Sequence, residues 1–162
     1  MIFELLEDGP LAENICPISP DYSSAGQITP EQLQQARQSG FKSVLNLRSP
    51  DEADFVSDEA AQAEVLGLAY SNAPVDPKLP ESDPLNKALY ALENLPKPVL
   101  VHCRGGARAT AVALAAIAVQ ENLTLEQFIQ QVTEQGLPLE QPQIQQFLQD
   151  HYGVGRDLEA EA

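Results

Sequence analysis

The chain has 162 residues and a formal net charge of −15 at pH 7, with 43% hydrophobic and 20% charged residues. This composition is typical of a folded globular protein, and the length predicts one domain that buries roughly two-thirds of its extended surface. An acidic surface repels phosphate backbones and anionic lipids, so we expect neither a nucleic-acid partner nor binding to a membrane. Any anionic ligand therefore needs a local site that overcomes the overall charge.

The N-terminus, the apolar runs and the cysteines bear on the compartment. The segment MIFELLEDGPLAEN carries acids where an export signal needs bases, and the longest apolar run, 109–119, is too short to cross a bilayer. We therefore expect a cytoplasmic protein that keeps Cys16 and Cys103 as thiols, with a reversible disulfide between them as a minor alternative. The sequence contains no metal-binding spacing and no nucleotide motif, so we expect no metal and no cofactor.

In chain order, the first predicted elements are a short strand, a helix and a longer strand. The short strand covers 23–28. The helix starts at Thr29, which is followed by a proline and, at the third helical position, by Gln32; we expect it to end at Gly40. The run FKSVLNLR, 41–48, has the apolar and β-branched composition of a strand.

Helical and strand patterns alternate along the rest of the chain. The predicted elements are a helix over 57–67, a strand over 68–75, a loop with three prolines over 76–84, a helix capped by Asp83, a buried strand over 97–103 and an enclosed apolar helix over 109–119. Two further helices have apolar stripes: the first is capped by Thr124 and its stripe runs from Leu125 to Val132, and the stripe of the second runs from Ile144 to His151. This alternation indicates an α/β fold in three layers, with a mainly parallel sheet of four to five strands flanked by helices. We expect residues 1–154 to form a single domain and residues 155–162 to be an acidic disordered tail.

The stretch VLVHCRGGARAT, residues 99–110, carries the chemistry. In open α/β sheets, ligands bind beyond the carboxyl ends of the strands, near helix N-termini, and Cys103 follows a buried strand at such a place. Gly105 and Gly106 allow a tight turn whose amides point inward, and the guanidinium of Arg108 can bind two phosphate oxygens. The same positive field favours the thiolate form of Cys103, so the stretch predicts a tetrahedral-anion site with a nucleophile at its floor.

The alternative is an inert core cysteine at the end of a strand. Arg104 and Arg108 argue against it, because charged groups rarely flank a buried thiol without a partner. For Arg104 itself, a solvent-facing position and a substrate contact are equally compatible with the sequence. The predicted substrate-binding residues are Arg104, Gly105, Gly106, Ala107 and Arg108.

These residues resemble a known family. VLVHCRGGAR resembles the signature loop of the cysteine-dependent protein tyrosine and dual-specificity phosphatases, GFKSVLNLR is similar to their second strand, and LAYSNAPVD to the strand before their general-acid loop. From roughly residue 15 to residue 120, including AGQITPEQL, the chain more closely resembles the bacterial phosphatase-like domain family that also occurs fused to β-lactamase-like hydrolases. The resemblance implies a phosphatase-like three-layer sandwich and a metal-independent phosphomonoesterase.

The loop also departs from the phosphatase pattern. Four residues separate Cys103 from Arg108, whereas these phosphatases usually have five, and Ala109 stands where they carry Ser or Thr, for which Thr110 could substitute. A Cys-Arg-x-Gly-x-Arg loop is also the pattern of rhodanese-type sulfurtransferases, whose cysteine carries a persulfide. The loop alone therefore leaves both activities open.

Asp76 favours the phosphatase. It stands at the head of the proline-rich loop, where the phosphatases carry the aspartate that protonates the leaving oxygen, and a sulfurtransferase needs no such acid. A turn residue is the alternative for Asp76, and Asp83 is a weaker candidate acid because a capping role is expected for it. His102 also favours the phosphatase, with an imidazole that orients the loop backbone.

We therefore predict a phosphomonoester hydrolase that acts through a cysteinyl-phosphate intermediate on a phosphorylated protein or small molecule. The resemblance assigns catalytic roles to Cys103, Arg108 and Asp76, and His102 and Thr110 are expected to support the loop. The alternatives are a sulfurtransferase that uses a Cys103 persulfide and a non-catalytic module that binds phosphate or a phosphoprotein. Arg48 is expected to pair with the acids that follow it.

Overall fold

Five strands form the central sheet of the computed structural model, which describes residues 15–155. Their order is β1-β2-β5-β3-β4; β1 is antiparallel to β2, and the other pairs are parallel, which confirms the mainly parallel sheet. The strands are β1 (Ile15–Pro17), β2 (Tyr22–Ala25), β3 (Ser43–Asn46), β4 (Ala69–Asn72) and β5 (Val99–His102). The sequence patterns do not predict β1, because a three-residue strand that ends in proline is too short for a periodic signal.

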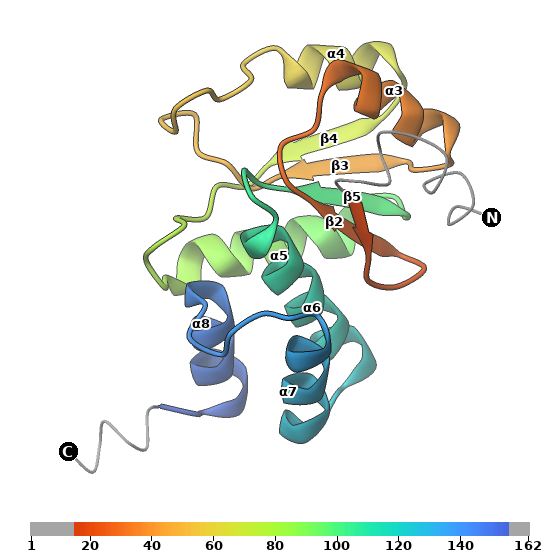
Figure 1. The fold of residues 1–162 in the computed structure, drawn as a ribbon. Helices are drawn as coiled ribbons and strands as arrows, with labels where there is room; N and C mark the ends of the chain where they lie inside the picture. Colours follow the sequence, from red (N-terminus) through yellow and green to blue (C-terminus); the bar gives the residue numbers. More distant parts are fainter. Residues whose placement is uncertain (1–14, 156–162) are drawn as a thin grey trace.

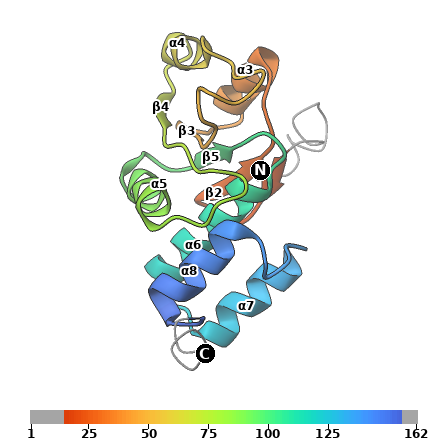
Figure 2. The same ribbon diagram turned by 90° about the vertical axis from the view of Figure 1, so that its left-hand side faces the viewer.

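Helices cover both faces of the sheet, as Figures 1 and 2 show. One face packs against α3 (Pro30–Gln38) and α4 (Glu59–Val65), and the other against α5 (Ser82–Asn94) and α6 (Ala107–Glu121). The last two helices, α7 (Leu125–Glu134) and α8 (Pro142–Tyr152), pack on α6. The predicted three-layer α/β fold is therefore confirmed, with an additional helical layer beyond α6.

Two helix starts follow the sequence signals closely. Thr29 and Thr124 each form a complete capping box with the glutamine at the third helical position, Gln32 or Gln127. The threonine side chain accepts a hydrogen bond from the backbone amide of the glutamine, and the glutamine side chain accepts one from the backbone amide of the threonine. Both boxes satisfy amides that would otherwise lack a partner at the helix ends. These local interactions fix where α3 and α7 begin.

The predicted start of α5 is wrong. Asp83 does not cap the helix, because α5 begins at Ser82, two residues earlier than predicted, and Glu81 takes the capping position. Asp83 and Pro84 lie in the first helical turn, where a carboxylate is favoured by the helix dipole and a missing N–H costs little. Tertiary contact helps to fix the earlier start, since Gln146 of α8 donates a hydrogen bond to the Ser82 hydroxyl at 2.8 Å.

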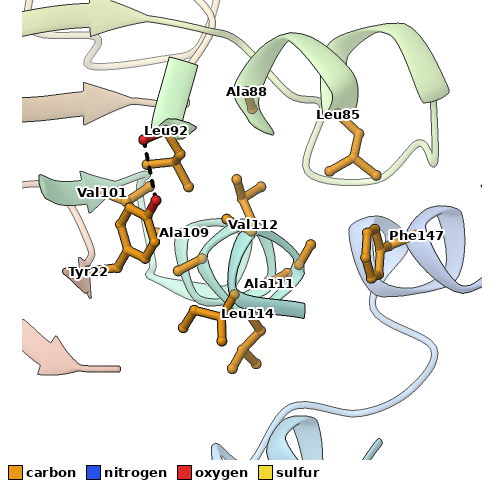
Figure 3. Packing of buried hydrophobic residues seen from close by; sticks show 14 of the residues in the cluster. Tyr22, Leu85, Ala88, Leu92, Val101, Ala109, Ala111, Val112, Leu114 and Phe147 are labelled. Carbon is orange, nitrogen blue, oxygen red and sulfur yellow. Dashed lines mark hydrogen bonds between the residues drawn. The ribbon is translucent and has the colours of Figure 1, made fainter. Parts of the chain in front are cut away.

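The core on the α5–α6 face is built around the alanine-rich helix α6 (Figure 3). Ten of its residues are buried, from Arg108 to Ala118, so the prediction of an enclosed helix is confirmed. Alanines let α6 approach the sheet, α5 and α8 at the same time. Close approach of this kind fixes the helix, because interiors packed at crystal-like density leave little room for displacement.

The parallel strands end in one row at the edge of the sheet. His102 is the register partner of both Ala25 and Asn46, and Asn46 is in turn the partner of Asn72. The segments that follow β2, β3, β4 and β5 therefore emerge side by side. This edge brings the site residues together.

Several expectations fall partly or wholly outside residues 15–155. The N-terminal segment and residues 156–162 of the predicted tail lie outside the described residues. Within the described part, no helix combines the length and apolar character that crossing a bilayer requires.

The packing of α6 yields a stability prediction. Ala113 is fully buried, so Ala113→Leu should reduce the free energy of unfolding by about 1–3 kcal/mol through overpacking. The matched control is Val119→Leu on the same helix, where the side chain is 49% exposed and a change below about 0.5 kcal/mol is expected. Urea unfolding measures both, and equal effects would show that α6 is not tightly enclosed.

Candidate active site

The loop between β5 and α6 contains the predicted nucleophile. Cys103 is only 1% exposed, and its Sγ accepts a hydrogen bond from the amide of Gly106 at 3.1 Å. Gly106 is the N-cap of α6 and has φ of 104°, a conformation that favours glycine. Because Cys103 lies just before α6, its sulfur is close to the positive end of the helix dipole as well as to this amide.

The segment just after β2 lies beside Gly106, at ordinary van der Waals distance. A Cβ at this position would lie 3.6 Å from the backbone nitrogen of Gly26, just after β2. The amide of Cys103 donates to the carbonyl of Ala25 at 3.1 Å, which ties the loop to the end of the same strand. The turn therefore depends on a glycine that can adopt a positive φ beside another backbone.

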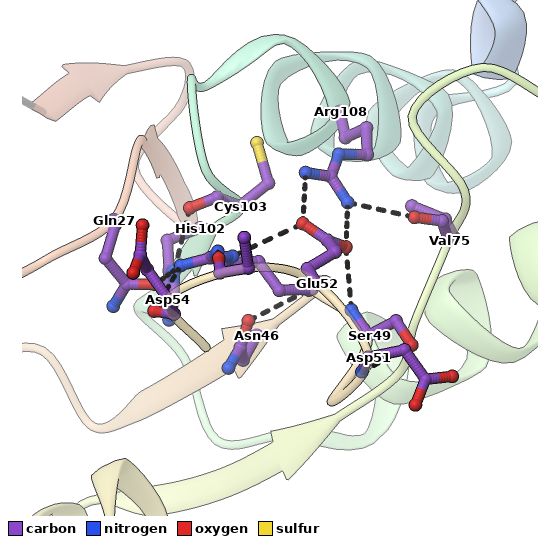
Figure 4. A network of polar contacts seen from close by, with 12 residues as sticks. Gln27, Asn46, Ser49, Asp51, Glu52, Asp54, Val75, His102, Cys103 and Arg108 are labelled. Carbon is purple, nitrogen blue, oxygen red and sulfur yellow. Dashed lines mark hydrogen bonds and ion pairs between the residues drawn. The ribbon is translucent and has the colours of Figure 1, made fainter. Parts of the chain in front are cut away.

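Arg108 lies in the first turn of α6 and is held by two partners (Figure 4). Its Nη1 and Nη2 donate to the two carboxylate oxygens of Glu52 at 2.8 and 3.0 Å, and Nη1 also donates to the carbonyl of Val75 at 3.0 Å. The guanidinium is buried and its orientation is fixed from two sides. Such a bidentate pair is among the strongest polar contacts in proteins.

Glu52 joins a second arginine to this pair. It accepts a hydrogen bond from Arg48 at 3.3 Å and one from the amide of Ser49 at 2.8 Å. Burial raises the pKa of Glu52, but the hydrogen bonds and charges of Arg108, with those of Ser49 and Arg48, outweigh it and lower that pKa from 4.5 to about 2. Glu52 is therefore a carboxylate at neutral pH and holds both guanidinium groups.

His102 reaches from the end of β5 to α4. Its Nε2 lies 2.5 Å from Glu59 Oε2, and its Nδ1 lies 3.2 Å from the carbonyl oxygen of Cys103. The other oxygen of Glu59 accepts a hydrogen bond from Gln27, whose own side-chain oxygen accepts one from Arg48. A continuous polar network thus runs beneath the loop from Glu59 to the Arg48–Glu52–Arg108 cluster.

Asp76 lies at the head of the loop that follows β4, as the sequence predicts. One of its carboxylate oxygens accepts hydrogen bonds from the amides of Lys78 and Leu79, at 2.7 and 3.0 Å, so Asp76 organises the turn. The charge of Asp76 also acts on Arg108. Burial lowers the pKa of Arg108, but Glu52, Cys103 and Asp76 together raise that pKa above its ordinary value. Asp76 therefore stabilises the turn and is also close enough to Arg108 for their charges to interact.

The remaining predicted residues occupy different parts of the loop. Arg104 is exposed and makes no ion pair within residues 15–155, and Gly105 and Ala107 are also exposed. The hydroxyl of Thr110 donates a hydrogen bond to the carbonyl of Gly106 at 3.0 Å, not to the sulfur, and lies 2.7 Å from the hydroxyl of Ser24. Thr110 thus connects Gly106 of the loop with Ser24 of β2.

Four residues of the network were not predicted as site residues: Gln27, Arg48, Glu52 and Glu59. Arg48 was expected only to pair with nearby acids, and its bond to Glu52 agrees with that expectation. The sequence marks three of them only by position: Gln27 comes shortly after β2, and Arg48 and Glu52 come shortly after β3. Only the strand order shows that these ends adjoin Cys103.

The two thiols occupy different environments. Cys103 is buried, whereas Cys16 on β1 is exposed and donates to the side chain of Gln135 at 3.4 Å; both are free. Within residues 15–155, no group of three or more His, Cys, Asp and Glu side chains is placed to hold a metal ion.

The sequence and the fold were compared with known proteins. Residues 14–120 match the family model of the beta-lactamase hydrolase-like protein, phosphatase-like domain. No curated protein matches the chain.

Three solved structures illustrate the structural similarity. A DUF442 protein from Shewanella putrefaciens CN-32 is 25% identical, with a TM-score of 0.72 over 98% of this chain and 97% of that one. The core catalytic domain of the PP-IP phosphatase SIW14 from S. cerevisiae, solved with citrate, is 19% identical, with a TM-score of 0.66 over 91% of each chain. PTPMT1 in complex with PI(5)P is 14% identical, with a TM-score of 0.70 over 89% of this chain and 98% of that one.

The Glu52–Arg108 pair yields a prediction about pH. Because the pKa of Glu52 is about 2 when folded and 4.5 without its partners, its contribution is complete above pH 4.5 and is lost as the pH falls towards 2. This group should account for about 3 kcal/mol of the fall in unfolding free energy across that range. Glu52→Gln should remove that part of the pH dependence in denaturant unfolding, whereas Glu126→Gln on α7 should keep it. Parallel profiles for the wild type and Glu52→Gln would contradict the assignment.

Proposed function

Because the chain belongs to the phosphatase-like domain family of beta-lactamase hydrolase-like proteins, we propose that it hydrolyses phosphomonoesters through a cysteinyl-phosphate intermediate without a metal ion. The observation that carries the proposal is the position of Cys103, whose sulfur accepts the amide of Gly106 at the N-terminus of the helix that bears Arg108. A thiol nucleophile requires reducing conditions, so we also propose a cytoplasmic location.

In the first step, the Cys103 thiolate attacks phosphorus in line with the leaving oxygen. The S–P bond forms as the P–O bond to the leaving group breaks, and Asp76 gives its proton to that oxygen. The loop amides and Arg108 stabilise the charge on the three equatorial oxygens. Glu52 and the carbonyl of Val75 hold the guanidinium in place, so little reorganisation is needed when the substrate binds.

In the second step, water hydrolyses the thiophosphate ester. Asp76, now ionised, accepts a proton from the attacking water, a P–O bond forms, and the S–P bond breaks to regenerate the thiolate. Inorganic phosphate then leaves. Each proton is transferred to or from Asp76, whose place on the loop after β4 puts it within electrostatic range of Arg108.

The same loop geometry supports a second candidate, sulfur transfer. Four residues separate Cys103 from Arg108, a spacing shared with rhodanese-type loops. In that reaction, the thiolate takes the outer sulfur of thiosulfate, sulfite leaves, and cyanide then removes the sulfur as thiocyanate. Asp76 has no part in these steps, and its position therefore favours the phosphatase.

Three variants test the proposed chemistry. Cys103→Ser should abolish hydrolysis of p-nitrophenyl phosphate, and Asp76→Asn should lower kcat by about 10²- to 10⁴-fold through loss of the general acid. Asp83→Asn is the matched control, since Asp83 lies in the first turn of α5, and its activity should stay within about twofold of wild type. A chelator should have no effect.

The same protein should be assayed for transfer from thiosulfate to cyanide. A Cys103-dependent transfer without phosphate release would reverse the ranking of the two activities. Tight binding of phosphate or a phosphopeptide without either turnover would instead indicate a binding module. Full phosphatase activity in Cys103→Ser would end the cysteine mechanism.

The overall charge predicts the response to salt. At −15 the protein repels a substrate that carries several phosphates, and this repulsion is screened as the Debye length falls from about 30 Å at 0.01 M salt to about 10 Å at 0.1 M. The KM for a polyphosphorylated inositol should therefore fall several-fold over this range, while that for p-nitrophenyl phosphate changes less. Steady-state kinetics at both salt concentrations measures this, and a KM that rises with salt would contradict it.

A further inference from the structure

Glu59 is a buried carboxylate on α4 whose two oxygens both serve the segments around Cys103. It is 1% exposed, although it lies in the first turn of a surface helix. Oε1 accepts a hydrogen bond from Gln27 Nε2 at 2.9 Å, and Oε2 lies 2.5 Å from His102 Nε2. Glu59 thus joins the segment after β2 to the last residue of β5.

Gln27 and His102 in turn hold two successive carbonyls of the loop. His102 Nδ1 lies 3.2 Å from the carbonyl oxygen of Cys103, and the backbone amide of Gln27 donates to the carbonyl oxygen of Arg104 at 3.0 Å. In a planar trans peptide, the N–H points opposite to the C=O. Fixing these two carbonyls therefore directs the next two amides, of Arg104 and Gly105, away from His102 and Gln27.

The protons of the His102–Glu59 contact follow from its partners. The Cys103 carbonyl can only accept, so Nδ1 of His102 carries a hydrogen. A bare nitrogen and a carboxylate would repel at 2.5 Å, so a proton also lies between Nε2 and Oε2. An uncharged amide could serve the same geometry, because it can donate to a bare Nε2 and accept from Gln27.

We propose that Glu59 is a positioning residue for the Cys103 loop: through His102 and Gln27 it turns the amides of Arg104 and Gly105 toward the bound oxyanion, alongside the amide of Gly106. The function of this cradle rests on the proposed phosphatase activity. The property of Glu59 that matters is the length of its side chain, which brings two polar atoms from α4 to Gln27 and His102. The charge of Glu59 is secondary.

Three substitutions of Glu59 separate the effect of side-chain length from that of charge. Glu59→Gln keeps the length and both hydrogen bonds but removes the charge, whereas Glu59→Asp keeps the charge but is one methylene too short. Glu59→Ala removes both. All are made in a Cys16→Ser background, so that Cys103 is the only thiol, and Glu126→Gln, at an exposed position of α7, serves as the remote control.

The first measurement needs no enzymatic substrate. Cys103 is alkylated with iodoacetate, an anion, and with iodoacetamide, its neutral counterpart; in both cases the S–C bond forms and iodide leaves. Inward-pointing amides favour the anion, so the ratio of the two rate constants reports the cradle and cancels general changes in thiol exposure or reactivity. Glu59→Ala and Glu59→Asp should lower this ratio about tenfold, and Glu59→Gln and Glu126→Gln should keep it within about twofold.

The second measurement is turnover of p-nitrophenyl phosphate, with folding checked by circular dichroism and thermal unfolding. Misdirected amides should lower kcat/KM by about 10- to 100-fold in Glu59→Asp and Glu59→Ala, with near-wild-type values in Glu59→Gln. If Glu59→Ala fails to fold, the Gln and Asp variants decide the question between them.

The two proposals can fail separately. An unchanged alkylation ratio in Glu59→Asp, or a loss in Glu59→Gln as large as in Glu59→Asp, overturns the positioning role whatever the activity. Absence of phosphatase turnover in the wild type, with the alkylation pattern as expected, overturns the proposed function but leaves the role of Glu59 in shaping the loop intact.

Discussion

Four parallel strands end in register, and this register decides which residues can act together. β2 ends at Ala25, β3 at Asn46, β4 at Asn72 and β5 at His102, and the next residues of each strand supply one part of the site. Cys103 follows β5, Gln27 follows β2, Glu52 lies on the segment after β3, and Val75 and Asp76 follow β4. Because the strands are parallel, these short segments meet at one edge, where helix N-termini also gather. The layers of helices mainly keep this edge fixed.

At that edge, positive and negative side chains are paired with one another, although the whole protein carries a large negative net charge. Two arginines, Arg48 and Arg108, surround the carboxylate of Glu52, and His102 lies against Glu59. Buried charges are costly unless they are paired and fully hydrogen-bonded, so the network holds its members in defined positions. An acidic protein can therefore keep an oriented guanidinium beside a thiol without an exposed basic patch.

Local sequence signals predicted the elements whose causes are local. The capping boxes at Thr29 and Thr124 place two helix starts, and the loop from Cys103 to Arg108 stands out because charge and glycine follow an apolar strand. The start of α5 and the roles of Glu52 and Glu59 were not predictable, because they depend on contacts with distant segments. β1 was missed for the same reason: its evidence is its pairing with β2, while its own three residues carry no pattern.

The alanine-rich helix α6 has a consequence for how the family can diversify. Its enclosed body anchors Arg108, and the ends of the loop are tied to β2 and α4, so the frame tolerates little change. Between these anchors, the side chains of Arg104 and Ala107 face solvent. Natural variation or laboratory selection can therefore change these two side chains while the inherited scaffold stays constant.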